Sequence, residues 1–103
     1  MIAQTPQPPY YAVIFTSIRT AGDDGYGDMA TEMGELAARQ NGYLGIESAR
    51  NETGITVSYW ASLEAIKNWK AVSRHQLAQK YGRDKWYESY KVRICLVERD
   101  YEF

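Results

Sequence analysis

The sequence is short of the residue types that build disulfides and metal sites. Among its 103 residues it holds one cysteine, Cys95, and one histidine, His75. A single cysteine excludes an intrachain disulfide, and one of each is too few for an ordinary cysteine–histidine zinc site. Twelve basic residues against thirteen acidic ones give a formal net charge of -1. This balance provides no excess of positive charge that would attract nucleic acid or an anionic membrane.

Long apolar runs and targeting segments are also missing. No stretch approaches the roughly 18 consecutive apolar residues that a membrane helix needs. Residues 1–9 lack the basic and apolar blocks of a signal peptide. We therefore expect a reduced, cytoplasmic protein with no membrane segment. The length predicts one domain, in which residues 1–9 form an extended N-terminal arm and residues 10–103 form the folded part.

The spacing of apolar residues predicts four strands and two helices. Strands are expected at residues 10–18, 43–50, 55–60 and 87–99, because these runs are rich in β-branched and aromatic residues. A first helix is expected from an N-cap at Asp24 to Asn41, where Gly42 takes the left-handed conformation. A second helix begins after Ser62 and ends at Tyr81-Gly82, and a shift of its apolar stripe leaves a break near residues 71–73 open.

This order is β-α-β-β-α-β, the ferredoxin-like α+β fold with an antiparallel sheet and both helices on one face. That architecture leaves the other face of the sheet bare. Yet Ile14 and Phe15, which are neighbours on opposite faces of the first strand, are both apolar. The simplest cover is a second copy that packs sheet to sheet, so we expect a homodimer.

Aromatic residues are in excess, with three Trp, nine Tyr and two Phe. By the alternation of side chains along a strand, Phe15, Tyr59 and Tyr90 are expected to face the helices and to bind a substrate there. The phenol of Tyr59 would need a hydrogen-bond partner from the protein or from a ligand. Four aromatic residues towards the C-terminus are expected near a dimer contact: Trp86, Tyr87, Tyr101 and Phe103.

The segment SYWASLEAIKNW, from Ser58 to Trp69, and the closing WYESY and VERDY resemble the antibiotic biosynthesis monooxygenase (ABM) domain family. The resemblance covers residues 10–103. Within the family, the sequence most resembles the small stand-alone bacterial members. It implies a dimeric α+β barrel. It also implies oxygen chemistry on a hydrophobic polycyclic molecule, without flavin or metal.

Another branch of the same superfamily degrades heme, with an Asn on the first strand and a Trp and a His from the second helical segment. Trp69 matches that Trp. The first strand offers Thr16 and Ser17 but no Asn, and His75 follows Trp69 by only six residues. A heme-binding monooxygenase is therefore the alternative to a cofactor-independent one.

The expected function is oxidation of an aromatic or quinone-like molecule in a cleft between sheet and helices. His75 is the candidate base and Trp69 a second catalytic candidate that would hold the substrate by stacking. For each candidate residue the alternative is a purely structural role, such as a solvated helix histidine or a core tryptophan. For the whole protein, a further alternative is a non-catalytic dimer that binds a small molecule in the same cleft.

Overall fold

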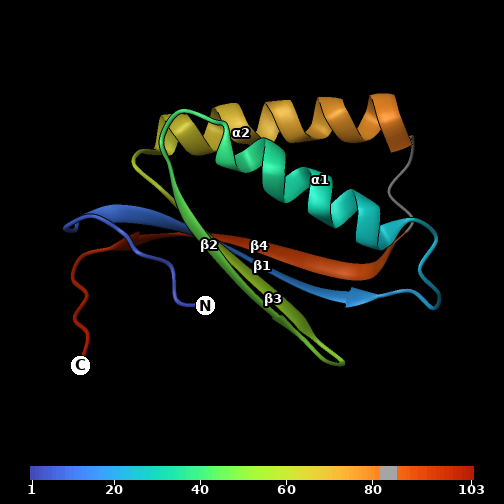
Figure 1. Ribbon diagram of the computed structural model, residues 1–103, viewed down its shortest axis with the longest axis horizontal. Coiled ribbons are helices and arrows are strands. Elements are labelled where there is room, and N and C mark those ends of the chain that lie inside the picture. Colours follow the sequence, from blue (N-terminus) through green and yellow to red (C-terminus); the bar gives the residue numbers. More distant parts are fainter. Residues whose placement is uncertain (82–85) are drawn as a thin grey trace.

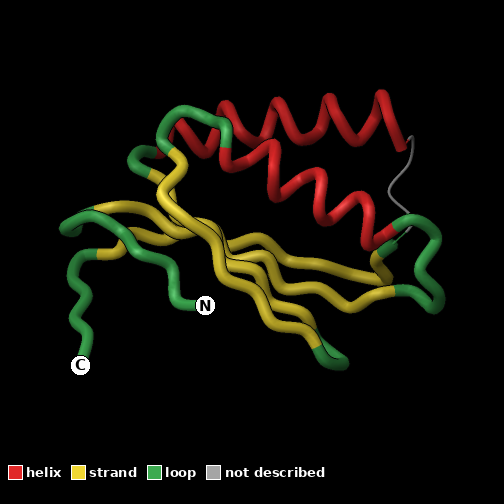
Figure 2. The backbone as a smooth tube through the Cα atoms, viewed as in Figure 1, coloured by secondary structure: helices red, strands yellow, loops and turns green. Residues whose placement is uncertain are grey.

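A computed structural model describes residues 1–81 and 86–103 and arranges them in two layers (Figure 1). A four-stranded sheet forms one layer, and both helices lie together on one side of it (Figure 2). The elements are β1 (Tyr10–Arg19), α1 (Tyr26–Ala38), β2 (Tyr43–Arg50), β3 (Gly54–Trp60), α2 (Leu63–Gln76), a π-helix (Leu77–Tyr81) and β4 (Tyr87–Val97). The predicted β-α-β-β-α-β order is confirmed.

The sheet is antiparallel throughout, with strand order β2-β3-β1-β4. In its register, Tyr11 of β1 lies opposite Trp60 of β3 and Leu96 of β4. Tyr11 and Trp60 pack into the core with the helices. The side chains that alternate in step with Tyr11 and Trp60 therefore point towards the helices, and we call this side of the sheet the helix face. The other side chains of each strand point to the opposite side, which we call the open face.

The first helix begins in a different way from the predicted one. Asp24 does not cap it. The residue before the helix is Gly25, with a left-handed φ of 84°, and no side chain caps at that position. The carboxylate of Asp23 instead accepts hydrogen bonds from the backbone N–H groups of Gly25 and Gly27, at 3.0 and 3.3 Å. At the other end, Gly42 has a φ of 86°, the left-handed conformation that was predicted.

Helix α2 begins as predicted but continues further without interruption. Oγ of Ser62 accepts a hydrogen bond from the backbone N–H of Ala65 at 3.1 Å, which confirms the N-cap. The alternative of a break near residues 71–73 does not occur, because the α-helix is continuous from Leu63 to Gln76 and changes to a π-helix only afterwards. Gly82, the predicted end of this helix, lies outside the described residues.

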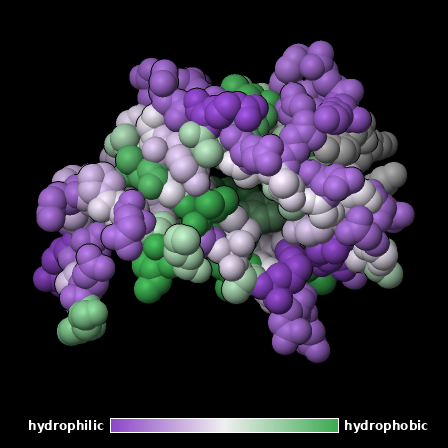
Figure 3. All heavy atoms as spheres, viewed as in Figure 1, coloured by the Kyte–Doolittle hydropathy of each residue, from purple (hydrophilic) through white to green (hydrophobic). Residues whose placement is uncertain are grey.

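The core lies where α1 and α2 meet the sheet. Trp60 is fully buried there with Ala37, Ala65 and Ile66. On the face of the molecule seen in Figure 3, hydrophobic atoms gather over the middle and hydrophilic atoms cover the outer side of the helices. Trp86 is also buried, at 2% exposure, and its indole N–H donates to the backbone oxygen of Asp24 at 2.9 Å. The expectation that Trp86 lies at a dimer contact is therefore wrong, since its own chain covers it.

Candidate functional site

Aromatic rings from three elements meet on the helix face, towards the end of β1 and at the start of β4. The ring centroids of Phe15 and Tyr90 are 5.3 Å apart, and those of Phe15 and Tyr87 are 5.2 Å apart. Tyr26, the first residue of α1, lies edge-on to Tyr87 with centroids at 5.9 Å. We call these four residues the aromatic cluster. Such rings bind a flat hydrophobic molecule by stacking and edge-to-face contact.

Two arginines add positive charge beside the aromatic cluster. The guanidinium carbon of Arg19 lies 3.6 Å from the ring centroid of Tyr26, a close cation–π contact. Nε of Arg19 is buried and donates no hydrogen bond to the residues that the structure describes. Nη2 of Arg50 donates to Oγ of Ser17, which is 1% exposed. The guanidinium of Arg50 lies over Gly54, in the space that a side chain at position 54 would occupy.

The structure brings Phe15 and Tyr90 together as predicted, and it places the two catalytic candidates elsewhere. Trp69 is half-buried and stacks on Trp60, with centroids 5.9 Å apart and ring planes 22° apart. His75 is exposed near the end of α2. Because α2 is unbroken between Trp69 and His75, a spacing of six residues points them in different directions.

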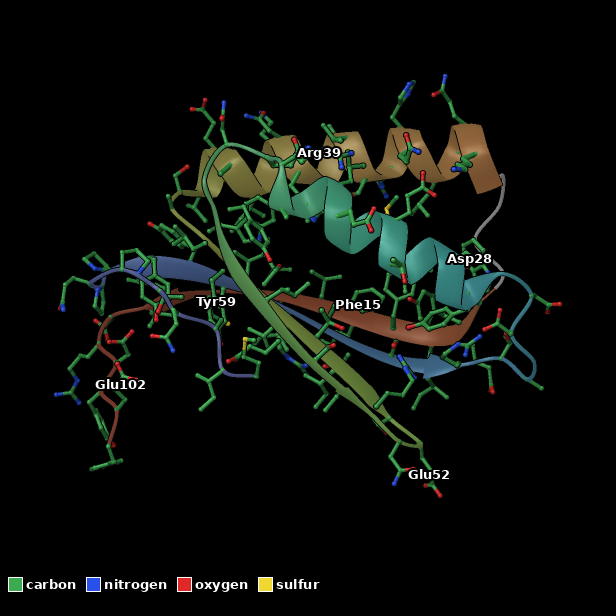
Figure 4. The ribbon with its side chains drawn as sticks, viewed as in Figure 1. Phe15, Asp28, Arg39, Glu52, Tyr59 and Glu102 are labelled. Atoms are coloured by element: carbon green, nitrogen blue, oxygen red, sulfur yellow. The ribbon has the colours of Figure 1, made fainter. Side chains whose placement is uncertain are left out.

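The prediction that Tyr59 faces the helices is wrong. Tyr59 pairs with Ala12 in the β1–β3 register and lies on the open face. Its hydroxyl donates to Oε1 of Glu47 at 2.6 Å, and Oε2 of Glu47 accepts from the backbone N–H of Ala3 at 2.9 Å. In Figure 4, Phe15 lies between the sheet and α1, whereas Tyr59 lies beside the N-terminal arm.

These contacts set the charge state of the Glu47–Tyr59 pair. The hydrogen bond from Tyr59, followed by the one from Ala3, lowers the pKa of Glu47. Burial, followed by the hydrogen bond to Glu47, raises the pKa of Tyr59. At neutral pH the pair is therefore a carboxylate and a neutral phenol. It ties the N-terminal arm to the sheet on the face away from the helices.

Two cavities are found by the open face, at opposite ends of the sheet. One, of about 460 Å³, lies between the N-terminal arm and the C-terminal residues, and Tyr59 and Glu47 line it. The other, of about 330 Å³, lies near the start of β4 between Thr16, Ile18 and Lys91. Tyr90 lies at the edge of this second cavity, but its ring belongs to the aromatic cluster on the helix face, so neither cavity holds both predicted binding residues Tyr59 and Tyr90.

Sequence reasoning missed Arg50 and Tyr26 at the aromatic cluster, and it missed Glu47 as the partner of Tyr59 on the open face. Glu47 had a readable signal, since it alternates with Gly45 and Ala49 on a strand next to the one that carries Tyr59. Tyr87 was expected near a dimer contact, and it packs against Phe15 in the aromatic cluster instead. Its position depends on the pairing of β1 with β4, which alternation within one strand does not reveal.

A model of the family described as "Antibiotic biosynthesis monooxygenase" matches residues 9–81. The chain belongs to this family. Within it, the chain is 52% identical over 100 residues to "Uncharacterized protein YqjZ" of Bacillus subtilis, a match that spans 95% of this chain and 88% of YqjZ.

Solved structures of low sequence identity share the fold of this ABM protein. One is a variant of SnoaB, described as a cofactor-independent oxygenase from Streptomyces nogalater, with a TM-score of 0.72, 9% identity, and coverage of 88% of this chain and 95% of SnoaB. Another is a variant of MhuD with two manganese protoporphyrin IX molecules bound per active site, with a TM-score of 0.69, 17% identity, and coverage of 90% and 99%. These neighbours confirm the ferredoxin-like fold. Among the described residues, no helix is both long and apolar enough to span a membrane.

Proposed function

We propose that this ABM protein is a cofactor-independent monooxygenase that oxidises an aromatic or quinone-like molecule bound against the aromatic cluster. The observation that carries the proposal is the meeting of Phe15, Tyr26, Tyr87 and Tyr90 on the helix face of the sheet. Family membership and the fold shared with SnoaB, a cofactor-independent oxygenase, support the same chemistry.

The proposed reaction needs only the substrate and molecular oxygen. An electron-rich aromatic substrate with an activated methylene, such as an anthrone, loses a proton and transfers an electron to O₂. The two radicals combine to a hydroperoxide, which loses water and leaves a carbonyl group. One oxygen atom of O₂ enters the product and the other leaves as water, so the methylene carbon is oxidised and O₂ is reduced. The protein supplies orientation, desolvation and a proton acceptor.

In this proposal Phe15 and Tyr90 form the wall against which the substrate lies. Trp69 stacks on Trp60 and His75 is exposed on α2, both apart from the aromatic cluster, so their proposed roles as stacking residue and base concern a part of the substrate that extends beyond the cluster towards α2. Tyr59 has no part in this site, because it lies on the open face. It therefore provides a control position.

Oxygen uptake with an anthrone tests the proposal. Phe15→Ala and Tyr90→Ala should each raise KM about tenfold, because they remove the stacking surface. Tyr59→Phe should leave KM unchanged, since it changes only the opposite face. His75→Ala should lower kcat about a hundredfold if the imidazole is the base. Uptake that is unaffected by His75→Ala and by Trp69→Phe would remove both catalytic assignments.

Heme binding is the second candidate function, and the fold shared with MhuD, whose structure holds a metalloporphyrin, is the observation that favours it. A hemin titration separates the two candidates. A Soret shift that saturates at stoichiometric hemin supports the heme alternative, and the absence of any shift removes it. Saturable binding of an anthrone without oxygen uptake would instead indicate a non-catalytic binding protein.

We also propose that the protein is a homodimer that joins through the open face of the sheet. The support is the apolar side chains that this face leaves uncovered, among them Ile18 and Ile55 at 38% and 46% exposure. Sedimentation velocity tests the dimer directly, and a monomer at micromolar concentration would contradict it. The cytoplasmic location stays a prediction, which cell fractionation can test.

A further inference from the structure

The chain exposes more surface than a compact monomer of its size. Its accessible surface is 7441 Å², whereas a folded monomer of 11.8 kDa exposes about 5,900 Å². The radius of gyration is 14.0 Å, against about 12.8 Å for a compact domain of this length. One partner in a standard interface contributes about 800 Å². The accessible surface in excess of that of a compact monomer is therefore large enough to account for a stable interface.

A basic cavity lies at one end of the open face. It is the cavity of about 330 Å³ at the start of β4. The register pairs Thr16 with Lys91 and Ile18 with Ser89, so these side chains share the open face with Arg93. None of the described residues that line the cavity is acidic. The positive charge of Lys91 and Arg93, together with the apolar side chain of Ile18, suits a segment that carries both a carboxylate and hydrophobic side chains.

A segment of that kind follows the other end of β4. After Val97 the chain leaves the sheet and extends away from the body of the molecule (Figure 1). The root of this tail is fixed, because the hydroxyl of Tyr10 donates to Oδ2 of Asp100 at 2.5 Å. Beyond Asp100 the side chains are uncovered, with Tyr101 at 82% and Phe103 at 113% exposure and their ring centroids 5.5 Å apart.

We infer that the C-terminal tail of each protomer docks into the basic cavity of a second copy, with Glu102 beside Lys91 and Arg93. This inference rests on the proposed homodimer. The cavity lies near the start of β4 and the tail follows its end, both at the edge of the sheet formed by β4. A twofold axis that crosses β4 at right angles superposes the tail of one copy on the cavity of the other, and it makes both contacts at once. An axis parallel to β4 would instead bring the two acidic ends together.

Charge reversal on each side tests the docking. Lys91→Glu with Arg93→Glu in one chain, and Glu102→Arg in another, should each weaken the dimer about tenfold or more, as like charges then face each other. In a mixture of the two variants both contacts regain opposite charges. A heterodimer of wild-type affinity should therefore form. Lys67→Glu with Lys70→Glu, on exposed positions of α2, is the matched control and should leave the dimer unchanged.

Sedimentation velocity with one protomer fluorescently labelled measures dimer formation by the wild type, by each variant and by the mixture. Circular dichroism of each variant checks that it is folded. Restoration on mixing supports the docking, because neither misfolding nor a general change in net charge would be repaired by a second variant. A wild-type monomer would contradict the proposed homodimer. A wild-type dimer that both reversals leave intact would overturn the docking of the tail while leaving the homodimer in place.

Discussion

Replacing Gly42 by alanine tests how closely the start of α2 approaches the loop between α1 and β2. Gly42 has a φ of 86°, and a Cβ at this position would lie 2.6 Å from Cβ of Ala65 in the first turn of α2. The left-handed conformation costs a residue with a side chain about 1–2 kcal/mol. Overpacking adds about 1–3 kcal/mol. We therefore expect Gly42→Ala to lower the free energy of unfolding by about 2–5 kcal/mol.

Gly25 is the matched control for Gly42. Its φ is 84°, and an added Cβ would meet nothing within 4 Å. Gly25→Ala should therefore cost only the conformational part, about 1–2 kcal/mol. Urea denaturation measures both losses. The double variant Gly42→Ala, Ala65→Gly removes the colliding methyl group and should recover part of the loss. Equal losses for Gly42→Ala and Gly25→Ala, with no recovery in the double variant, would refute the close approach.

Two further predictions concern the tie of the N-terminal arm and the start of α2. The pKa of Glu47 is lowered in the folded protein, so its contribution to stability is present above the ordinary value of 4.5 and is lost as pH falls through the folded value. Glu47→Gln should lower Tm at pH 7 and remove part of its decrease in acid, and an acid profile identical to that of the wild type would contradict this. Ser62→Ala should lower the free energy of unfolding by about 1 kcal/mol through the lost N-cap, whereas an unchanged urea midpoint would show that the cap contributes nothing.

Element order could be predicted from the sequence because its signals are local. The N-cap at Ser62 and the left-handed Gly42 depend on a few neighbouring residues, and both are confirmed. The start of α1 was misplaced because two adjacent aspartates precede it, and only the backbone path decides that Asp23 reaches the N–H groups of Gly25 and Gly27. Such choices depend on backbone geometry rather than on residue type.

The orientation of β3 could not be predicted from alternation alone. Ile55, Val57 and Tyr59 form the more apolar set, which favoured that set for the helix face. The structure turns them to the open face and places Trp60 with Ser58 under the helices. Ser58 is tolerated there because its Oγ accepts a hydrogen bond from the indole N–H of Trp60 at 2.9 Å. An apolar set on the open face is what a strand needs when a partner covers that face.

The aromatic cluster depends on contacts between distant parts of the chain. Phe15 and Tyr90 share the helix face, as predicted, because alternation within each strand was enough for them. Tyr87 joins them through the register shift between Ile18 and Arg19, where β4 has one extra residue, and Tyr26 joins them through the entry into α1; no periodicity describes either feature. The site was therefore half predictable: Phe15 and Tyr90 followed from alternation within a strand, whereas Tyr26 and Tyr87, at the first positions of α1 and β4, did not.

The most direct test of the central proposal is the fate of isotopically heavy O₂ during oxidation of an anthrone by the protein without added metal, flavin or heme. Mass spectrometry of the product reports where the oxygen goes. The proposed monooxygenase chemistry predicts a carbonyl product that carries one heavy oxygen atom, formed with one equivalent of O₂ consumed. Product formed no faster than in the absence of protein, or product that carries no heavy oxygen, would contradict it.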